Sequence, residues 1–306
     1  MCIRDSFKDA TAEWSSDLVA PGLVNDFEWT DLNGDQKMDL VILGEWMPIQ
    51  FFENSGSSFT NTTDKYLNKT LSGWWYKIHK ADIDNDGDED FIVGNLGLNS
   101  KFHATDKKPF SVLANDFDSN GTLDVVLTKD YKGKKVPVRG RECSSEQMPF
   151  IAEKFATYND FAHASVEDIL GEESIKQSVS LSVNNFESGV LRNNGGSYSF
   201  EAFPRFAQAF PIMGIETKDL NKDGYLDLIL AGNIYNMEIE TPRLDAGEGL
   251  ILMGGKNGFK ISTAIENGFH APKDVKDICM LKASNDQSLI IVANNNGPLD
   301  IFQTIR

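Results

Sequence analysis

Acidic side chains recur at alternate positions in four short segments of this sequence. The segments read DLNGDQKMD (31–39), DIDNDGDED (82–90), DFDSNGTLD (116–124) and DLNKDGYLD (219–227), and we call them loops 1 to 4. Each has Asp or Asn at positions 1, 3 and 5 and Asp at position 9. Hard cations such as Ca²⁺ take roughly six to eight oxygen ligands, and alternate residues of a curled loop can aim several carboxylates at one point. The pattern therefore predicts a calcium site in each loop.

The predicted ligands are the oxygen-bearing residues of the four loops, with the backbone carbonyl of Asp88 added at position 7 of loop 2. They are Asp31, Asn33, Asp35 and Asp39 in loop 1; Asp82, Asp84, Asp86, Asp88 and Asp90 in loop 2; Asp116, Asp118, Asn120 and Asp124 in loop 3; and Asp219, Asn221, Asp223 and Asp227 in loop 4. Three loops have Gly at position 6, where a sharp turn favours a residue that adopts positive φ without steric cost. Loop 1 instead has Gly34 at position 4 and Gln36 at position 6.

The formal net charge of −17 is concentrated in these loops, which hold fifteen acidic residues against Lys37 and Lys222. Bound divalent cations would relieve the repulsion within each loop. Nucleic-acid binding draws on clustered Lys and Arg, so no nucleic-acid partner is expected. No run of eighteen or more apolar residues occurs, and the chain is therefore predicted to contain no membrane span.

Short apolar segments flank every loop and indicate β-strands. Segments such as LVNDFEWT and FSVLAN come before the loops, and MDLVIL, EDFIVG, LDVVLT and LDLILA follow them. An EF-hand would end its loop with a bidentate Glu at position 12 and would place helices on both sides. Position 12 is Ile42, Val93, Leu127 or Leu230 here, so the EF-hand interpretation is disfavoured.

Turn-linked segments after the loops, such as MPIQFFENSGSSFTN and SGVLRNNGGSYSFEAF, predict hairpins. The repeating unit is thus about four strands and one calcium loop, and such units repeated at about 40 to 50 residues indicate an all-β fold, a β-propeller. A fifth, degenerate copy is predicted in residues 277–302. There Lys282, Ser284, Asp286 and Ile290 occupy the ligand positions, and calcium binding is expected to be lost.

With these motifs in place, the sequence resembles the FG-GAP/VCBS repeat family, the calcium-loop blade also found in integrin α-subunit heads. The resemblance covers most of residues 20–306 and implies one propeller region over residues 1–306. Propellers of the family usually close with about seven blades. Five copies are counted here, so the alternative to a closed ring is the C-terminal part of a longer protein.

Residues 130–175 interrupt the blade pattern. Apolar residues at mixed three and four spacing, Ser165 with Asp168 as a cap signature and Gly171 as a stop predict two short helices inserted in the third blade, at about 140–172. The segment is similar to an insert in large bacterial VCBS-repeat proteins that are predicted to lie outside the cell. The resemblance therefore implies an extracellular, periplasmic or cell-surface location, with a signal peptide in the full-length protein.

Residues that could contact a ligand lie outside the loops. Trp74 and Trp75 could offer flat faces to a sugar, although aromatic residues on propeller strands more often belong to the core. Tyr235 and Arg243 lie in residues 232–249, a polar segment that departs from the blade pattern and fits either a recognition loop or a plain structured loop. No catalytic residue is assigned, because nothing in the sequence brings Cys143 together with a histidine.

The sequence thus favours a calcium-stabilised, non-enzymatic module that binds a protein or a glycan. Two alternatives remain open: an enzyme of polysaccharide breakdown on a propeller scaffold, and a domain that only spaces others in a longer chain.

Overall fold

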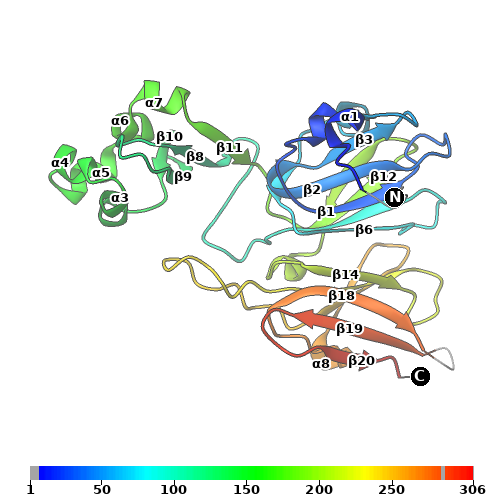
Figure 1. Cartoon of the computed structure of the whole chain (residues 1–306). Helices are drawn as coiled ribbons and strands as arrows, with labels where there is room; N and C mark the ends of the chain where they lie inside the picture. Colours follow the sequence, from blue (N-terminus) through cyan, green and yellow to red (C-terminus); the bar gives the residue numbers. More distant parts are fainter. Residues whose placement is uncertain (1–6, 284–286, 306) are drawn as a thin grey trace, which may run out of the picture. The chain divides into compact units, whose positions relative to one another are not determined.

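The computed structural model describes residues 7–283 and 287–305, and it divides the chain into two compact units (Figure 1). Unit 1 contains the described residues up to Lys101 and those from Phe186 onward, and unit 2 is Phe102–Asn185. Unit 2 is inserted in the sequence between two strands of unit 1, β7 (Asp90–Gly94) and β12 (Gly189–Asn193). These two strands pair directly with each other.

Unit 1 contains four antiparallel sheets, which we number I to IV in chain order. Sheet I is β1 (Leu23–Thr30), β2 (Asp39–Pro48), β3 (Gln50–Asn54) and β4 (Phe59–Asn61), with β5 (Ser72–Trp74) pairing β2; sheet II is β6 (Lys77–Ala81), β7, β12 and β13 (Tyr198–Ala202); sheet III is β14 (Gly214–Lys218), β15 (Asp227–Ala231), β16 (Leu250–Met253) and β17 (Lys260–Thr263); sheet IV is β18 (Val275–Lys282), β19 (Ser288–Asn294) and β20 (Asp300–Gln303). Short helices connect them: α1 (Thr11–Trp14), η1 (Ser16–Leu18), α2 (Thr63–Tyr66), η2 (Arg205–Gln208) and α8 (Ala264–Asn267). In sheets II and III the neighbouring strands follow chain order, as in a meander.

The apolar runs after loops 2 and 4 are buried on both faces because their strands, β7 and β15, lie between two other sheets. In β15, Leu228 and Leu230 pack toward sheet II, whereas Ile229 and Ala231 pack toward sheet IV. In β7, Phe91 faces the core shared with sheet I. The sheets therefore stack face to face in the series I, II, III, IV, and period-2 alternation decides which residue enters which core.

The first strands of the sheets, β1, β6, β14 and β18, are neighbours in the same order. Antiparallel meanders that stack face to face with their first strands side by side have the arrangement of propeller blades. The fold prediction is confirmed at this level: the chain is rich in antiparallel, mostly four-stranded sheets and its helices are short.

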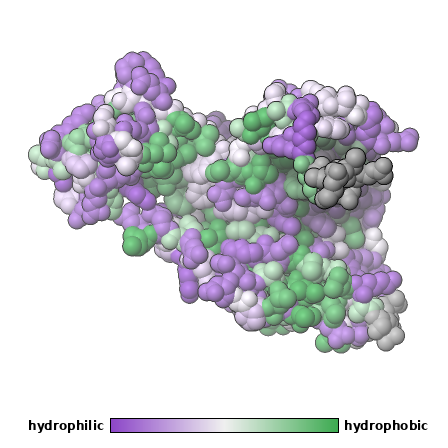
Figure 2. Space-filling view, viewed as in Figure 1, coloured by the Kyte–Doolittle hydropathy of each residue, from purple (hydrophilic) through white to green (hydrophobic). Residues whose placement is uncertain are grey.

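The outward face of sheet IV is apolar. Cys279 and Leu281 of β18 are exposed, Leu281 at 52%, and Ile301 of β20 is 61% exposed. Cys279 and Ile301 flank Ile291 in register, so these side chains share one face. Figure 2 shows apolar atoms gathered over this sheet.

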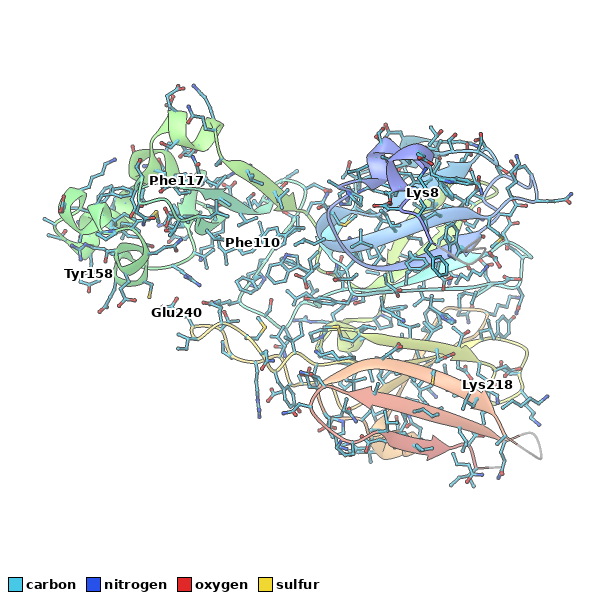
Figure 3. All side chains as sticks on the ribbon, in the orientation of Figure 1. Lys8, Phe110, Phe117, Tyr158, Lys218 and Glu240 are labelled. Atoms are coloured by element: carbon cyan, nitrogen blue, oxygen red, sulfur yellow. The ribbon has the colours of Figure 1, made fainter. Side chains whose placement is uncertain are left out.

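Unit 2 holds loop 3 and a sheet with the order β10-β9-β8-β11, made of β8 (Phe110–Asn115), β9 (Asp124–Tyr131), β10 (Lys134–Pro137) and β11 (Val179–Val183). Between β10 and β11 lie α3 (Arg141–Gln147), α4 (Phe150–Lys154), α5 (Tyr158–His163), α6 (Val166–Leu170) and α7 (Glu172–Lys176). Their apolar residues form one core with Leu113 and Val126 of the sheet, and Phe117 of loop 3 packs against it (Figure 3).

Two sequence-based expectations differ from this arrangement. The helical segment contains five short helices instead of two, because the chain turns extended after Gln147, Lys154 and His163. The predicted capping box of Ser165 with Asp168 is present. Loop 3 also belongs to the inserted unit and to a sheet with another strand order, so it is not the third member of the stacked series.

Without unit 2, the starts of loops 1, 2 and 4 would lie about fifty residues apart, which restores a regular repeat. Among the described residues, no helix has the length and apolar character needed to cross a membrane.

Candidate metal sites

The four loops share one hydrogen-bonding pattern. At position 1, the Asp side chain accepts hydrogen bonds from the backbone N–H groups of positions 5 and 6, with N–O distances of 2.8–3.2 Å. The accepting residues are Asp31, Asp82, Asp116 and Asp219. Because each loop curls around its first aspartate in the same way, the side chains of positions 3 and 5 start from equivalent places.

All four loops have positive φ at both position 4 and position 6. The pairs are Gly34 (77°) with Gln36 (67°), Asn85 (61°) with Gly87 (94°), Ser119 (61°) with Gly121 (85°), and Lys222 (63°) with Gly224 (91°). The sequence places one glycine in each pair, at position 4 in loop 1 and at position 6 elsewhere. The exceptional glycine of loop 1 therefore preserves the same backbone instead of marking a different loop.

The aspartate at position 9 is buried in every loop, with 0–2% of its surface exposed: Asp39, Asp90, Asp124 and Asp227. Its Oδ2 accepts a hydrogen bond of 2.8–3.1 Å from the backbone N–H of position 2, which closes the loop. Burial raises the pKa of Asp39, Asp90 and Asp227, since the charged form loses its hydration. A cation beside these carboxylates would offset that cost.

The acidic groups converge closely enough to hold a metal ion. Carboxylate oxygens of Asp82, Asp84 and Asp86 all lie within 4.8 Å of one another. Asp116, Asp118 and Asp124 form an equivalent group in loop 3. In loops 1 and 4 position 3 is Asn, which supplies an amide oxygen in place of a carboxylate. The oxygen-only donor sets fit a hard cation such as Ca²⁺.

Of the fifth, degenerate copy, Ser284 and Asp286 lie outside the described residues. Lys282 is the last residue of β18, and Ile290 of β19 is buried in the core between sheets III and IV. In register, Ser288, the first residue of β19, pairs with Lys282 as Asp39 pairs with Thr30. A serine, and not Ile290, therefore stands where the other loops have the position-9 aspartate, and the predicted alignment of this copy is wrong by two residues.

The aromatic candidates for sugar binding are largely core residues. Trp75 is fully buried and its Nε1 donates to the carbonyl of Leu71 at 3.3 Å, so it presents no face to solvent and its predicted ligand-binding role fails. Trp74 is partly buried and packs edge-on against Trp46 and Phe186, with centroid distances of 5.1 and 5.3 Å.

The structure does bring Tyr235 and Arg243 together. The Arg243 guanidinium lies 4.7 Å from the centroid of the Tyr235 ring and its Nε donates to Asp245 at 2.8 Å. The Tyr235 hydroxyl donates to the carbonyl of Pro272. Beside them, the buried Asn233 side chain bonds Gly247 and the carbonyls of residues 272 and 273, and it thereby holds the segment against the start of sheet IV.

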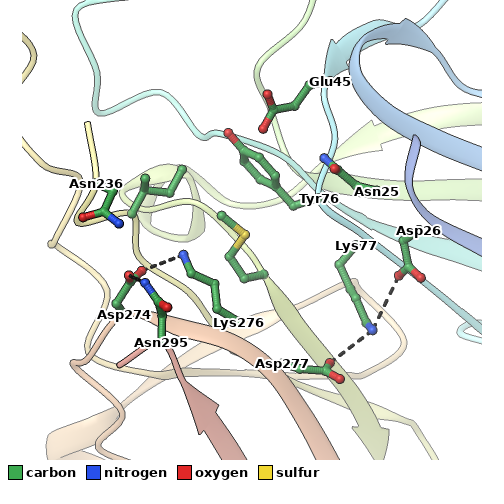
Figure 4. Close-up of a pocket in the computed structure, with 12 residues that line it drawn as sticks. Asn25, Asp26, Glu45, Tyr76, Lys77, Asn236, Asp274, Lys276, Asp277 and Asn295 are labelled. Atoms are coloured by element: carbon green, nitrogen blue, oxygen red, sulfur yellow. Dashed lines mark hydrogen bonds and ion pairs between the residues drawn. The ribbon is translucent and has the colours of Figure 1, made fainter. Parts of the chain in front are cut away.

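Sequence reasoning missed a polar cavity of about 490 Å³ in unit 1, beside the first strands (Figure 4). Lys77 lies between two carboxylates, 3.5 Å from Asp26 and 3.1 Å from Asp277. Glu45 and Tyr76 also line the cavity, and burial raises the pKa of both side chains. These residues come from β1, β2, β18, β6 and the residue just before β6, so no local sequence pattern could have grouped them.

Comparison with known families supports the repeat. Residues 31–93 match the family model of the FG-GAP-like repeat. The matched stretch contains loops 1 and 2 with the strands that follow them, and it confirms the resemblance that the acidic pattern indicated. Residues 31–93 are therefore similar to an FG-GAP-like repeat. No curated protein matches the chain.

The positive φ shared by the loops predicts that a side chain added at Gly121 destabilises the fold. A Cβ there would meet no atom within 4 Å, yet φ is +85°, so Gly121→Ala should lower the free energy of unfolding by about 1 kcal/mol. Gly255 is outside the left-handed region and a Cβ there would meet only the Gly258 carbonyl oxygen at 3.8 Å, an ordinary contact, so Gly255→Ala should leave stability unchanged or slightly higher. Urea unfolding of both variants measures this, and equal effects would contradict the strained-turn account.

The raised pKa of Glu45 predicts that Glu45→Gln stabilises the fold, and that the increase in stability depends on pH. At pH 7 the folded protein carries the cost of a buried carboxylate, so the variant should melt at a higher temperature than the wild type. Below the ordinary value of 4.5 the carboxyl is protonated in both folded and unfolded states, and the difference should disappear. The exposed Glu248→Gln is the control. A gain that persists unchanged at low pH would show that charge is not its cause.

Proposed function

We propose that the chain is a calcium-stabilised propeller-type interaction module of an exported or surface protein, and that it binds a protein or glycan without catalysing a reaction. The observation that carries the proposal is the common loop: four segments share one hydrogen-bond pattern, one pair of positive-φ positions and one buried aspartate. Four such loops with clustered carboxylates are expensive to fold unless cations neutralise them.

The proposed calcium is structural. Each loop connects the first and second strands of its sheet, and its position-9 aspartate is also the first residue of the second strand. A metal bound by side chains of positions 1, 3, 5 and 9 would therefore fasten the two strands at one end. Ca²⁺ is a weak Lewis acid, and a loop that supplies most of its ligands leaves little room for a substrate.

The proposed location follows from the same chemistry. Repeated oxygen-ligand loops without a bidentate Glu fit sites of modest affinity, which fill where free Ca²⁺ is abundant. This supports an extracellular, periplasmic or cell-surface setting. A signal peptide in the full-length protein belongs to the same proposal.

The ligand site that the geometry favours is the polar cavity beside the first strands. It offers amides, carboxylates, two lysines and the ring of Tyr76, a mixture suited to the hydroxyl groups of a glycan or to polar side chains of a protein. The exposed Arg243 and the partly buried Tyr235 form a second polar feature of unit 1. A purely structural spacer would need neither feature.

An enzyme of polysaccharide breakdown is a second candidate because of Glu45, a cavity carboxyl whose pKa burial raises toward that of a general acid. Glycoside hydrolysis generally needs a second carboxylate. Among the described lining residues, Asp26 and Asp277 are engaged by Lys77, and Asp274 lies 2.6 Å from Lys276. This pairing favours binding over hydrolysis.

Calcium should raise the melting temperature. A ligand at 100 times its Kd stabilises the fold by about 2.7 kcal/mol, so chelation by EGTA should lower the melting temperature by about 5 °C or more. Asp84→Ala with Asp86→Ala should remove part of the calcium-dependent gain. Asp17→Ala with Asp64→Ala removes two exposed charges outside the loops and should leave that gain intact. A melt indifferent to EGTA in the wild type would count decisively against calcium.

One experiment distinguishes a binding function from glycoside hydrolysis. The chain with calcium should retain particular oligosaccharides or protein partners on a glycan array or in a pull-down, and it should release no reducing sugar from the same polysaccharides. Release that Glu45→Gln abolishes would instead establish the enzyme.

A further inference from the structure

The guanidinium of Arg192 contacts two carboxylates of loop 2. From the third strand of sheet II, its Nη1 lies 3.2 Å from Oδ2 of Asp90 and 3.6 Å from Oδ2 of Asp84, and its Nε donates to Glu201 at 3.1 Å. The Arg192 side chain is only 16% exposed. Two of the carboxylates that would bind calcium, at positions 3 and 9, are thus engaged by a guanidinium.

Hydrogen bonds identify the matching residue beside loops 1 and 4. In each sheet one backbone N–H of the third strand, or of the residue just after it, donates to Oδ1 of the position-9 aspartate: Asn54 at 2.6 Å, Asn193 at 2.8 Å and Gly254 at 2.8 Å. The residue just before each donor is Glu53, Arg192 or Met253. One structural position therefore carries an anion, a cation or an apolar side chain.

We propose that the Arg192 guanidinium pairs with the Asp84 and Asp90 carboxylates when loop 2 holds no calcium. Calcium must displace the guanidinium from these carboxylates in order to bind, so the side chain changes its contacts when loop 2 binds calcium. The inference rests on the proposed calcium binding. Loop 2 is the most acidic of the four, with six acidic residues in nine positions, and the guanidinium partly neutralises it when no metal is bound. Affinity for Ca²⁺ follows the charge of the site, so a positive side chain among the ligands weakens binding.

A cavity beside Arg192 leaves space for its side chain to move away from loop 2. The cavity has a volume of about 350 Å³ and is lined by Asp84 and Glu201 together with the turn of residues 254–259. Glu201 is 59% exposed and is not a loop residue, so its pair with Arg192 can persist after Asp84 and Asp90 turn to the metal. Calcium in loop 2 would thereby change the charge facing this cavity.

Lys37 in loop 1 is a weaker case of the same contact. It lies 2.9 Å from Asp35, but its side chain is 42% exposed and hydration screens the pair. Arg192 is far less exposed and approaches two carboxylates, so its effect on calcium should be larger.

Each loop contains its own reporter for a test by NMR. The amides of Gln36 in loop 1, Gly87 in loop 2 and Gly224 in loop 4 all donate to the position-1 aspartate, so their signals should shift when that loop binds calcium. Because the Gly224 carbonyl also accepts a hydrogen bond from Asn85 of loop 2, Gln36 is the reference. In Arg192→Met, which copies the residue beside loop 4, the calcium midpoint of Gly87 should fall by about tenfold while that of Gln36 stays unchanged. Arg192→Lys retains the charge and should stay near wild type. Met253→Arg should raise the midpoint of Gly224 and leave that of Gln36 unchanged.

The outcomes separate this inference from the proposed function. A Gly87 midpoint that is unchanged or higher in Arg192→Met, with wild-type calcium binding intact, would overturn the displacement and make Arg192 a support for Asp90. Failure of both Gly87 and Gly224 to respond to calcium in the wild type would overturn the calcium proposal and this inference with it.

Discussion

A buried aspartate at the end of each loop is the contact on which the arrangement of loops and strands depends. Through Oδ2 it accepts the N–H of the second loop residue, and in sheets I, II and III its Oδ1 accepts an N–H next to or at the end of the third strand. One side chain thus joins the loop, the strand it begins and the neighbouring strand. Because it is almost completely buried, its charge has to be balanced locally.

The same need for balance explains both the metal and Arg192. Position-1 carboxylates use backbone N–H groups, which stabilise negative charge without neutralising it. Positions 3 and 5 add further charge beside them. A divalent cation balances these groups in one step, whereas loop 2 also has an internal cation within reach. The loops therefore share a geometry but differ in the side chain opposite the buried aspartate.

Local features of the fold could be predicted from the sequence with considerable accuracy. The segments LVNDFEWT and FSVLAN are the strands β1 and β8, and the acidic residues lie in loops between strands as the periodicity indicated. The FG-GAP-like match of residues 31–93 agrees with the family inferred from those motifs. These features depend on neighbouring residues, so alternation and glycine placement were sufficient.

Features that depend on distant residues could not be predicted. β7 pairs with β12, although the whole of unit 2 lies between them in the sequence. The order of motifs along the chain therefore placed loop 3 in a third blade of the same series. Trp75 could not be told from a surface aromatic without knowing that sheets I and II bury it. The approach of Arg192 to loop 2 likewise joins residues about a hundred positions apart, and no motif records it.

The central claim is that these clustered carboxylates exist to hold divalent cations, and counting bound metal tests it most directly. In equilibrium dialysis against saturating calcium, the excess of calcium on the protein side of the membrane, measured by elemental analysis, should equal one ion per loop, four per chain. A folded protein that binds no calcium even at saturating concentration would contradict the account, because the carboxylates would then stay clustered without the ion that they are proposed to hold.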